Sequence, residues 1–125
     1  DLVMLDIKLM DSSNHKKWTG LSNREILNNI VLLDKSFDNI IIRTPIIPGV
    51  NDKESEIAAI ANFISKLNNV KYYELINFNP LGASKYAGLG RFNFFAAEKP
   101  LEKERISEIA EFAGKYIGDV EIRYE

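Results

Sequence analysis

Four short apolar runs alternate along the chain with three longer segments in which apolar residues recur every three or four positions. The short runs are rich in β-branched and aromatic side chains, which favours strands. They lie at residues 2–7, 39–47, 70–78 and 120–124. The longer segments each carry one apolar stripe, which is typical of helices that pack on a sheet. They lie at residues 22–37, 53–67 and 101–117.

Turn and capping residues mark the ends of these elements. Ser22 and Glu25 have the spacing of a reciprocal capping pair, which predicts that the first helix begins there. Pro48 and Gly49 are turn residues that stop the second strand. Asp52 follows this turn, and we expect it to cap the second helix.

The alternation of strands and helices, without a hairpin signal, predicts an α/β fold with a parallel sheet and right-handed crossovers. A doubly wound sheet and part of a (β/α) barrel both satisfy this pattern. No linker or repeat interrupts it, so residues 1–125 are predicted to form a single domain. The chain starts at Asp1, without a methionine and already inside an apolar run, and we expect it to be a piece of a longer protein.

Composition and charge argue against several classes of protein. The net charge is -2 and both signs are interspersed, so no basic surface for nucleic acid or an anionic membrane is expected. No apolar stretch approaches the roughly 20 residues of a membrane span, and no signal pattern opens the chain, so a cytoplasmic location is expected. The chain contains no cysteine, so it cannot supply a disulfide or a thiolate metal ligand.

Polar side chains follow three successive strands near their carboxyl ends. Asp6 and Lys8 share one face of the first strand because side chains alternate along a strand. Arg43 lies near the end of the second strand, and Asn77 and Asn79 lie at the end of the third, before a long Gly- and Asn-rich loop. Sites in parallel α/β folds are built at this end of the sheet, so these residues predict one functional site.

Each of these residues also has a purely structural interpretation. Asp6 and Lys8 are compatible with a structural salt bridge between the two. Arg43 is compatible with an arginine that extends its charged end to water, and Asn79 with a turn residue before a proline. One shared site accounts for the three strand ends with fewer separate assumptions.

Four segments, in order, resemble the carboxyl-terminal half of the glycyl-radical-enzyme activating enzymes, the family of pyruvate formate-lyase activating enzyme. The segments are DLVMLDIK, TGLSN, IIRTPIIPGVND and NPLGASKYAGLG. The resemblance implies a radical S-adenosylmethionine fold, a partial (β/α)6 TIM-like barrel, of which this chain would supply the last three barrel strands. The first three strands would lie upstream.

The same resemblance implies a function for the full-length protein. It would be an iron-sulfur oxidoreductase that cleaves S-adenosylmethionine and generates a glycyl radical on a partner such as pyruvate formate-lyase, with flavodoxin or ferredoxin as electron donor. The [4Fe-4S] cluster would be held by three cysteines upstream. The chain itself has none and is therefore expected to be inactive alone.

The resemblance also assigns residues. Asp6 and Lys8 match a D-x-K motif whose members contact S-adenosylmethionine, and Asp6 with the main-chain carbonyl of Met4 would help to hold a monovalent cation. Arg43 would lie at the same cofactor site.

Further along, Thr44 and Pro45 would lie near the adenosine. Asn79 stands where pyruvate formate-lyase activating enzyme carries a histidine, and it would still be able to hydrogen-bond adenine.

Two other functions remain open at the level of sequence. A lysine at a barrel strand end beside an aspartate is also how Schiff-base lyases and aldolases present a nucleophilic amine, which would be Lys8 here. A half-barrel can also be a non-catalytic binding module. In either case the strand at residues 2–7 is predicted to be an exposed edge with an uncovered face beside it, which favours self-association.

Overall fold

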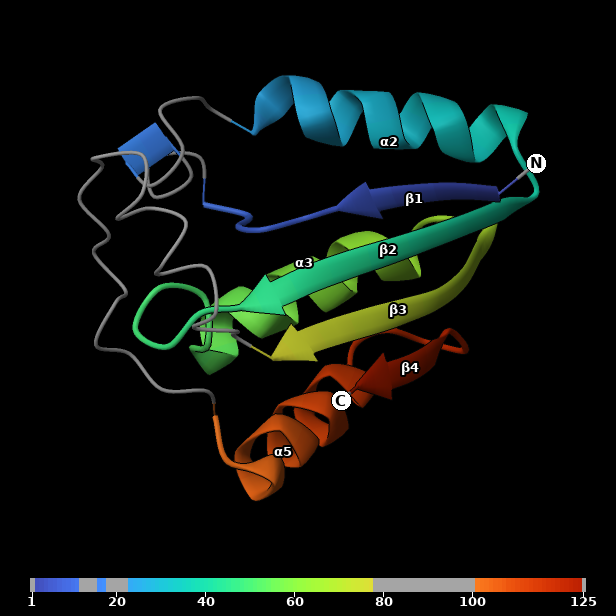
Figure 1. The fold of residues 1–125 in the computed structure, drawn as a ribbon. Coiled ribbons are helices and arrows are strands. Elements are labelled where there is room, and N and C mark those ends of the chain that lie inside the picture. Colours follow the sequence, from blue (N-terminus) through green and yellow to red (C-terminus); the bar gives the residue numbers. More distant parts are fainter. Residues whose placement is uncertain (1, 12–15, 18–22, 78–100, 125) are drawn as a thin grey trace, which may run out of the picture.

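The computed structural model describes residues 2–11, 16–17, 23–77 and 101–124 (Figure 1). Its strands and helices follow one another in the predicted alternating order. They are β1 (Leu2–Asp6), α2 (Arg24–Ser36), β2 (Asn39–Ile46), α3 (Glu54–Ser65), β3 (Val70–Asn77), α5 (Lys103–Gly114) and β4 (Glu121–Tyr124). Strand ends agree with the predicted ranges to within one residue. The helices end one to three residues earlier than the apolar stripes predict.

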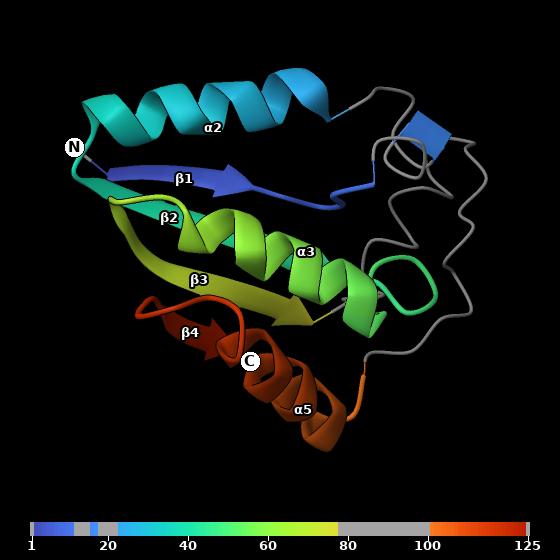
Figure 2. The same cartoon turned by 180° about the vertical axis from the view of Figure 1, so that it is seen from behind.

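The four strands form one parallel sheet in the order β1-β2-β3-β4, which confirms the predicted α/β class. Each strand therefore pairs with its neighbour in the chain. Helices α3 and α5 lie behind the sheet in Figure 1 and in front of it in Figure 2, while α2 runs beside β1. None of the helices in the described part of the chain covers the opposite face, which we call the open face. As predicted, β1 is an edge strand of this sheet.

The core lies between the sheet and the helices. The predicted stripes of α3 and α5 are buried there, because they face side chains that point from alternate positions of the strands. The stripe of α2 is only partly covered, with Ile30 buried and Ile26 and Val31 exposed. Its largest fully buried side chains include Ile40, Ile42, Ile46, Ile57, Ile60, Ile64, Tyr73, Leu75 and Ile106. On β1 the alternation is also as predicted, with Leu2, Met4 and Asp6 exposed and the residues between them partly covered.

The predicted helix caps differ from the observed ones. The N-cap of α2 is Asn23, whose side chain makes no capping hydrogen bond, and Ser22 lies outside the described residues. The N-cap of α3 is Lys53 rather than Asp52. The Asp52 carboxylate instead accepts a hydrogen bond from the N–H of Gly49 at 3.0 Å, because the turn folds back on itself where Gly49 adopts a φ of 79°.

A buried aspartate ties α2 to the connection that leads into β3. The carboxylate of Asp34 is 5% exposed and accepts hydrogen bonds from the backbone N–H groups of Asn68 at 2.9 Å and Asn69 at 2.8 Å. The carbonyl of Asn69 in turn accepts the N–H of Ile40 at 3.0 Å, at the start of β2. Asp34 therefore fixes the amino-terminal edge of the sheet.

In the described part of the chain, no helix has the length and apolar character needed to cross a membrane.

Candidate functional site

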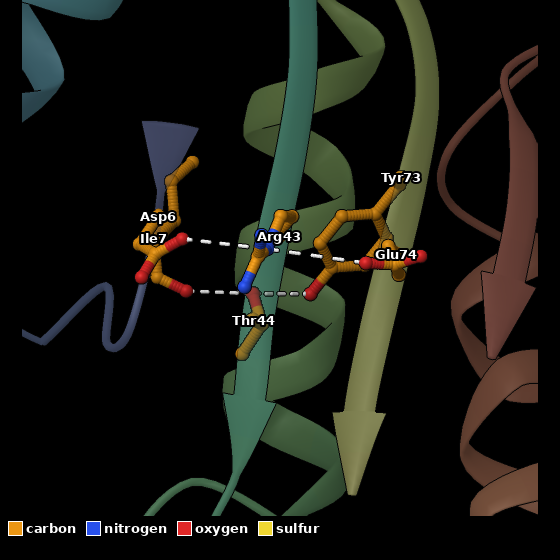
Figure 3. Close-up of polar contacts among 6 residues, drawn as sticks. All are labelled: Asp6, Ile7, Arg43, Thr44, Tyr73 and Glu74. Carbon is orange, nitrogen blue, oxygen red and sulfur yellow. Dashed lines mark hydrogen bonds and ion pairs between the residues drawn. The ribbon is translucent and has the colours of Figure 1, made fainter. Parts of the chain in front are cut away.

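A row of four charged side chains crosses the open face of the sheet. Asp6 on β1, Arg43 on β2, Glu74 on β3 and Arg123 on β4 are direct register partners, so the row alternates in sign across neighbouring strands. Figure 3 shows Arg43 between the carboxylates of Asp6 and Glu74. Asp6 and Arg43, which were expected at the same end of the sheet, are therefore neighbours in a row that also includes Glu74 and Arg123.

Arg43 is the centre of this row. Its Nε atom lies 3.8 Å from Oδ1 of Asp6 and 3.9 Å from Oε1 of Glu74. The side chains of Arg43, Asp6 and Glu74 are 35%, 46% and 26% exposed. Although the side chain is partly exposed, Nε is buried and has no hydrogen-bond partner among the described residues. Both distances allow electrostatic attraction but exceed the length of a hydrogen bond, so neither carboxylate satisfies this donor.

Met4 lies on β1 two residues before Asp6, and Lys8 lies two residues after Asp6, beyond the end of the strand. Both are exposed, and alternation places them on the same side as Asp6. Among the described residues no ion pair joins Asp6 to Lys8; the carboxylate of Asp6 faces Arg43 instead. The simple structural salt bridge between Asp6 and Lys8 is therefore not the arrangement in this structure.

Three side chains hold the segment that follows β1, residues 8–11. Asn51 is 1% exposed, and its Nδ2 group donates to the carbonyls of Lys8 at 3.0 Å and Pro45 at 2.8 Å, while its Oδ1 accepts the N–H of Ile47 at 2.7 Å. One side chain thus fixes the ends of β1 and β2 relative to each other.

The other two side chains come from α3 and from the start of α2. Asn23 donates from Nδ2 to the carbonyls of Leu9 at 2.8 Å and Met10 at 2.9 Å. The carboxylate of Glu56 accepts the backbone N–H of Met10. Asn23 is the last residue of the segment TGLSN, and Asn51 belongs to the segment PGVND. Through these two side chains, both segments hydrogen-bond to the backbone of residues 8–10.

Thr44 does not lie on the open face with Arg43. Its side chain is fully buried on the helix side, where Oγ1 donates to the carbonyl of Ile7 at 2.6 Å and accepts from the hydroxyl of Tyr73 at 2.7 Å (Figure 3). Strand alternation explains this, since consecutive residues point to opposite faces. The Thr44 side chain thus points away from the open face, whereas Pro45 is on the same face as Arg43; that Thr44 and Pro45 lie near the adenosine stays a prediction.

The hydroxyl of Tyr73 is the buried end of this chain of hydrogen bonds. Burial raises the pKa of Tyr73 well above its usual value of 10.0; the nearby Glu56 carboxylate adds to the shift, and the hydrogen bond to Thr44 opposes it. Below about pH 10 the tyrosine is protonated in both states and does not make stability depend on pH. Above that pH only the unfolded state releases the proton, so stability is lost as pH rises toward the folded-state pKa.

We expect Tyr73→Phe to lower the free energy of unfolding by about 1–2 kcal/mol near neutral pH, because Thr44 Oγ1 loses its buried donor. The deficit should shrink above pH 10, where only the wild type suffers the proton-linked loss. Chemical denaturation at several pH values measures both effects. Tyr116→Phe is the control, since Tyr116 is 39% exposed. A deficit that stays constant to pH 11 would contradict the pKa assignment.

Asn77 has a structural role at the end of β3. Its Nδ2 donates to the carbonyl of Leu101 at 2.8 Å, and its Oδ1 accepts the N–H of Leu101 at 2.9 Å. These two bonds fix Leu101 against the end of β3, so both polar atoms of the Asn77 side chain have a partner. Asn79, the other predicted residue of this strand end, lies outside the described residues.

Glu74 and Arg123 were missed for an identifiable reason. The predicted residue Asn77 shares its face of β3 with Tyr73 and Leu75, which pack on the helices, and Glu74 is on the other face. The register that aligns Glu74 with Arg43 is not visible in the sequence. Arg123 is also placed by the fold, with its guanidinium 3.8 Å from the ring centroid of Tyr72.

The described residues do not include a group of three or more His, Cys, Asp or Glu side chains that could hold a metal ion. The complete chain also lacks cysteine. A cluster that requires thiolate ligands therefore does not fit the residues of this chain.

Comparison with known proteins identifies a consistent set of relatives, although no family model matches the chain. The isethionate sulfite-lyase activating enzyme of Desulfovibrio desulfuricans is 47% identical over 91 residues, which cover 71% of this chain and 29% of that protein. The 4-hydroxyphenylacetate decarboxylase activating enzyme of Clostridioides difficile is 36% identical over 111 residues, 87% of this chain and 35% of that protein. The chain thus spans about a third of the length of these relatives.

A solved structure has the same fold. A domain of pyruvate-formate lyase-activating enzyme from Bacteroides vulgatus superposes with a TM-score of 0.76 at 22% sequence identity, over 99% of this chain and 66% of the other. The parallel sheet with helices between its strands is therefore shared with that domain.

Proposed function

From the premise that the homologues of this chain are glycyl-radical-enzyme activating enzymes, we propose that it is part of such an activase and supplies one side of its S-adenosylmethionine site. In this proposal residues 1–125 are one domain, the carboxyl-terminal part of a longer radical S-adenosylmethionine barrel, and β1 continues the sheet from upstream strands. The observation that carries the proposal is the position of Asp6 and Arg43 on the open face.

The residues of the open face suit the chemistry of this ligand. S-adenosylmethionine presents a carboxylate, a ribose diol and an adenine. Arg43 offers a partly exposed guanidinium, and exposed Lys8 offers a second cation for a carboxylate. Asp6 can accept from a diol or, with the carbonyl of Met4, bind a monovalent cation.

Two further residues complete the proposed site. Pro45 follows Arg43 on the same face and would border the adenosine. Asn79 would address the adenine edge by hydrogen bonds, as an amide side chain can donate and accept.

The iron-sulfur cluster does not fit this chain, because no cysteine is present to ligate it. We propose that the upstream part of the protein holds a [4Fe-4S] cluster, which supplies the electron for reductive cleavage of bound S-adenosylmethionine. The residues of this chain would then bind and orient that cofactor and shield it from water. The chain alone would not be active.

The wider assignment follows from the same premise. The full-length protein would be an oxidoreductase of the cytoplasm that takes an electron from flavodoxin or ferredoxin and generates a glycyl radical on a partner, pyruvate formate-lyase or a relative. The relatives named above serve different partner enzymes, so the partner is proposed only by its class.

The Schiff-base alternative receives no support from the structure. A nucleophilic lysine is normally activated by desolvation or by a neighbouring cation. Lys8 is exposed in the described part of the chain.

Replacing Lys8 tests the proposed site in the full-length protein after anaerobic cluster reconstitution. We expect Lys8→Met to weaken S-adenosylmethionine binding about tenfold, because a charge-assisted contact to the ligand is lost. Isothermal titration measures the affinity, and 5′-deoxyadenosine formation reports turnover.

Lys66→Met is the matched control. Lys66 is exposed at the other end of the sheet, where α3 ends, so its loss should leave the affinity unchanged. A full-length protein that does not bind S-adenosylmethionine, or equal effects of the two substitutions, would contradict the proposal.

A further inference from the structure

We propose that Glu74 is a positioning residue that holds Arg43 in place, so that Asp6 remains available to the bound ligand. This inference rests on the proposed function. It assigns a role to the one carboxylate of the charged row that faces Arg43 from β3.

The geometry gives Arg43 two competing partners. Its Nε lies at nearly equal distances from the carboxylates of Asp6 and Glu74, and all three are in one register row. Glu74 is the less exposed of the two carboxylates, and on its other side Arg123 follows in the row. A less exposed carboxylate is screened less by water, so its attraction for Arg43 is the stronger.

The charges balance differently when a ligand is present. Without a ligand, Asp6 and Glu74 share Arg43. When Asp6 turns to a diol or a cation, Arg43 keeps a counterion only because Glu74 is there. Glu74 therefore lowers the free energy that is needed to separate the Asp6 carboxylate from Arg43. It also holds the guanidinium on the open face.

Without the Glu74 charge, Arg43 has Asp6 as its only close carboxylate among the described residues. The ligand must then break the Asp6–Arg43 pair before Asp6 can bind it. Binding weakens although Glu74 itself does not touch the ligand. This makes a specific prediction: the effect of Glu74 must depend on the presence of the Asp6 charge.

The test is a double-mutant cycle in the full-length protein with reconstituted cluster, using S-adenosylmethionine as the titrant. We expect Glu74→Gln to weaken binding about fivefold in the wild-type background and less than about twofold when Asp6→Asn is already present. Glu74→Asp should restore most of the affinity, because it returns the charge. The unfolding temperature should change little, which separates positioning from a general structural role.

Glu121→Gln is the matched control. It also removes one carboxylate from a strand residue, but Glu121 pairs with Arg123 and lies two register positions before the row of Arg43. We expect its effect on affinity to be below about twofold. Equal effects of Glu74→Gln in both backgrounds, or no rescue by Glu74→Asp, would overturn the inference while leaving the proposed function intact. Failure of the unaltered protein to bind S-adenosylmethionine would instead overturn the proposed function and, with it, this inference.

Discussion

Asn51→Ala is expected to lower the free energy of unfolding by about 3–5 kcal/mol, one of the two largest effects that we predict. The substitution leaves the carbonyls of Lys8 and Pro45 and the N–H of Ile47 without their partner. Asn51 is 1% exposed, so water cannot readily replace the lost hydrogen bonds.

Chemical denaturation measures this loss, and Asn62→Ala is the control because Asn62 is exposed on α3. Asn51→Asp is informative as a second variant. It keeps an acceptor for the N–H of Ile47 but turns a carboxylate oxygen toward two carbonyls, so we expect a comparable loss. A decrease of less than about 1 kcal/mol for Asn51→Ala would show that the site rearranges or admits water.

The second large effect is expected for Asp34→Ala, which should lower the free energy of unfolding by about 2–4 kcal/mol. The backbone N–H groups of Asn68 and Asn69 lose a buried acceptor, and the connection into β3 is released from α2. Amide hydrogen exchange at these two residues should accelerate more than in the centre of β3.

Asp34→Asn should lose about half as much, because one acceptor oxygen remains. Asp38→Ala is the control, as Asp38 is an exposed acidic residue that directly precedes β2. If the two alanine substitutions cost the same, the proposed role of the buried carboxylate is wrong.

The elements and their order were predictable because each rests on local periodicity. The stripe with Ile57, Ile60 and Ile64 must be a helix that packs on something. The isoleucine run of β2 is typical of a strand covered on both faces, and its three isoleucines are buried in the structure. Such patterns are contained in a few consecutive residues, and the structure confirms them.

The polar connections were not predictable in the same way. Asp52 was interpreted as a capping residue, because local sequence shows which backbone shapes a residue favours. Asn23 and Asn51 were named only as members of longer segments. The actual partners of Asn23 and Asn51 are the carbonyls of residues 8–10, on another element. Asp34 gave no signal at all, since a single acidic residue in a helix is normally exposed.

The candidate site was predictable in part. Asp6 and Arg43 were expected at the same end of the sheet, because carboxyl ends of parallel strands meet at one edge, and they are register partners in the structure. Strand alternation alone places Thr44 opposite to Arg43, whereas Glu74 required the register between β2 and β3. That register depends on tertiary packing rather than on the residues nearby in the chain.

The strands have the same order in the sheet as in the chain, and this affects how the protein can fold. Each strand docks on the strand made just before it, so no pairing must wait for a distant part of the chain, and loop-closure entropy stays moderate at every step. A nascent chain can then add one βα unit at a time during synthesis. On this route Arg43 first comes close to Asp6, when β2 docks on β1. It comes close to its second carboxylate, Glu74, only when β3 docks on β2.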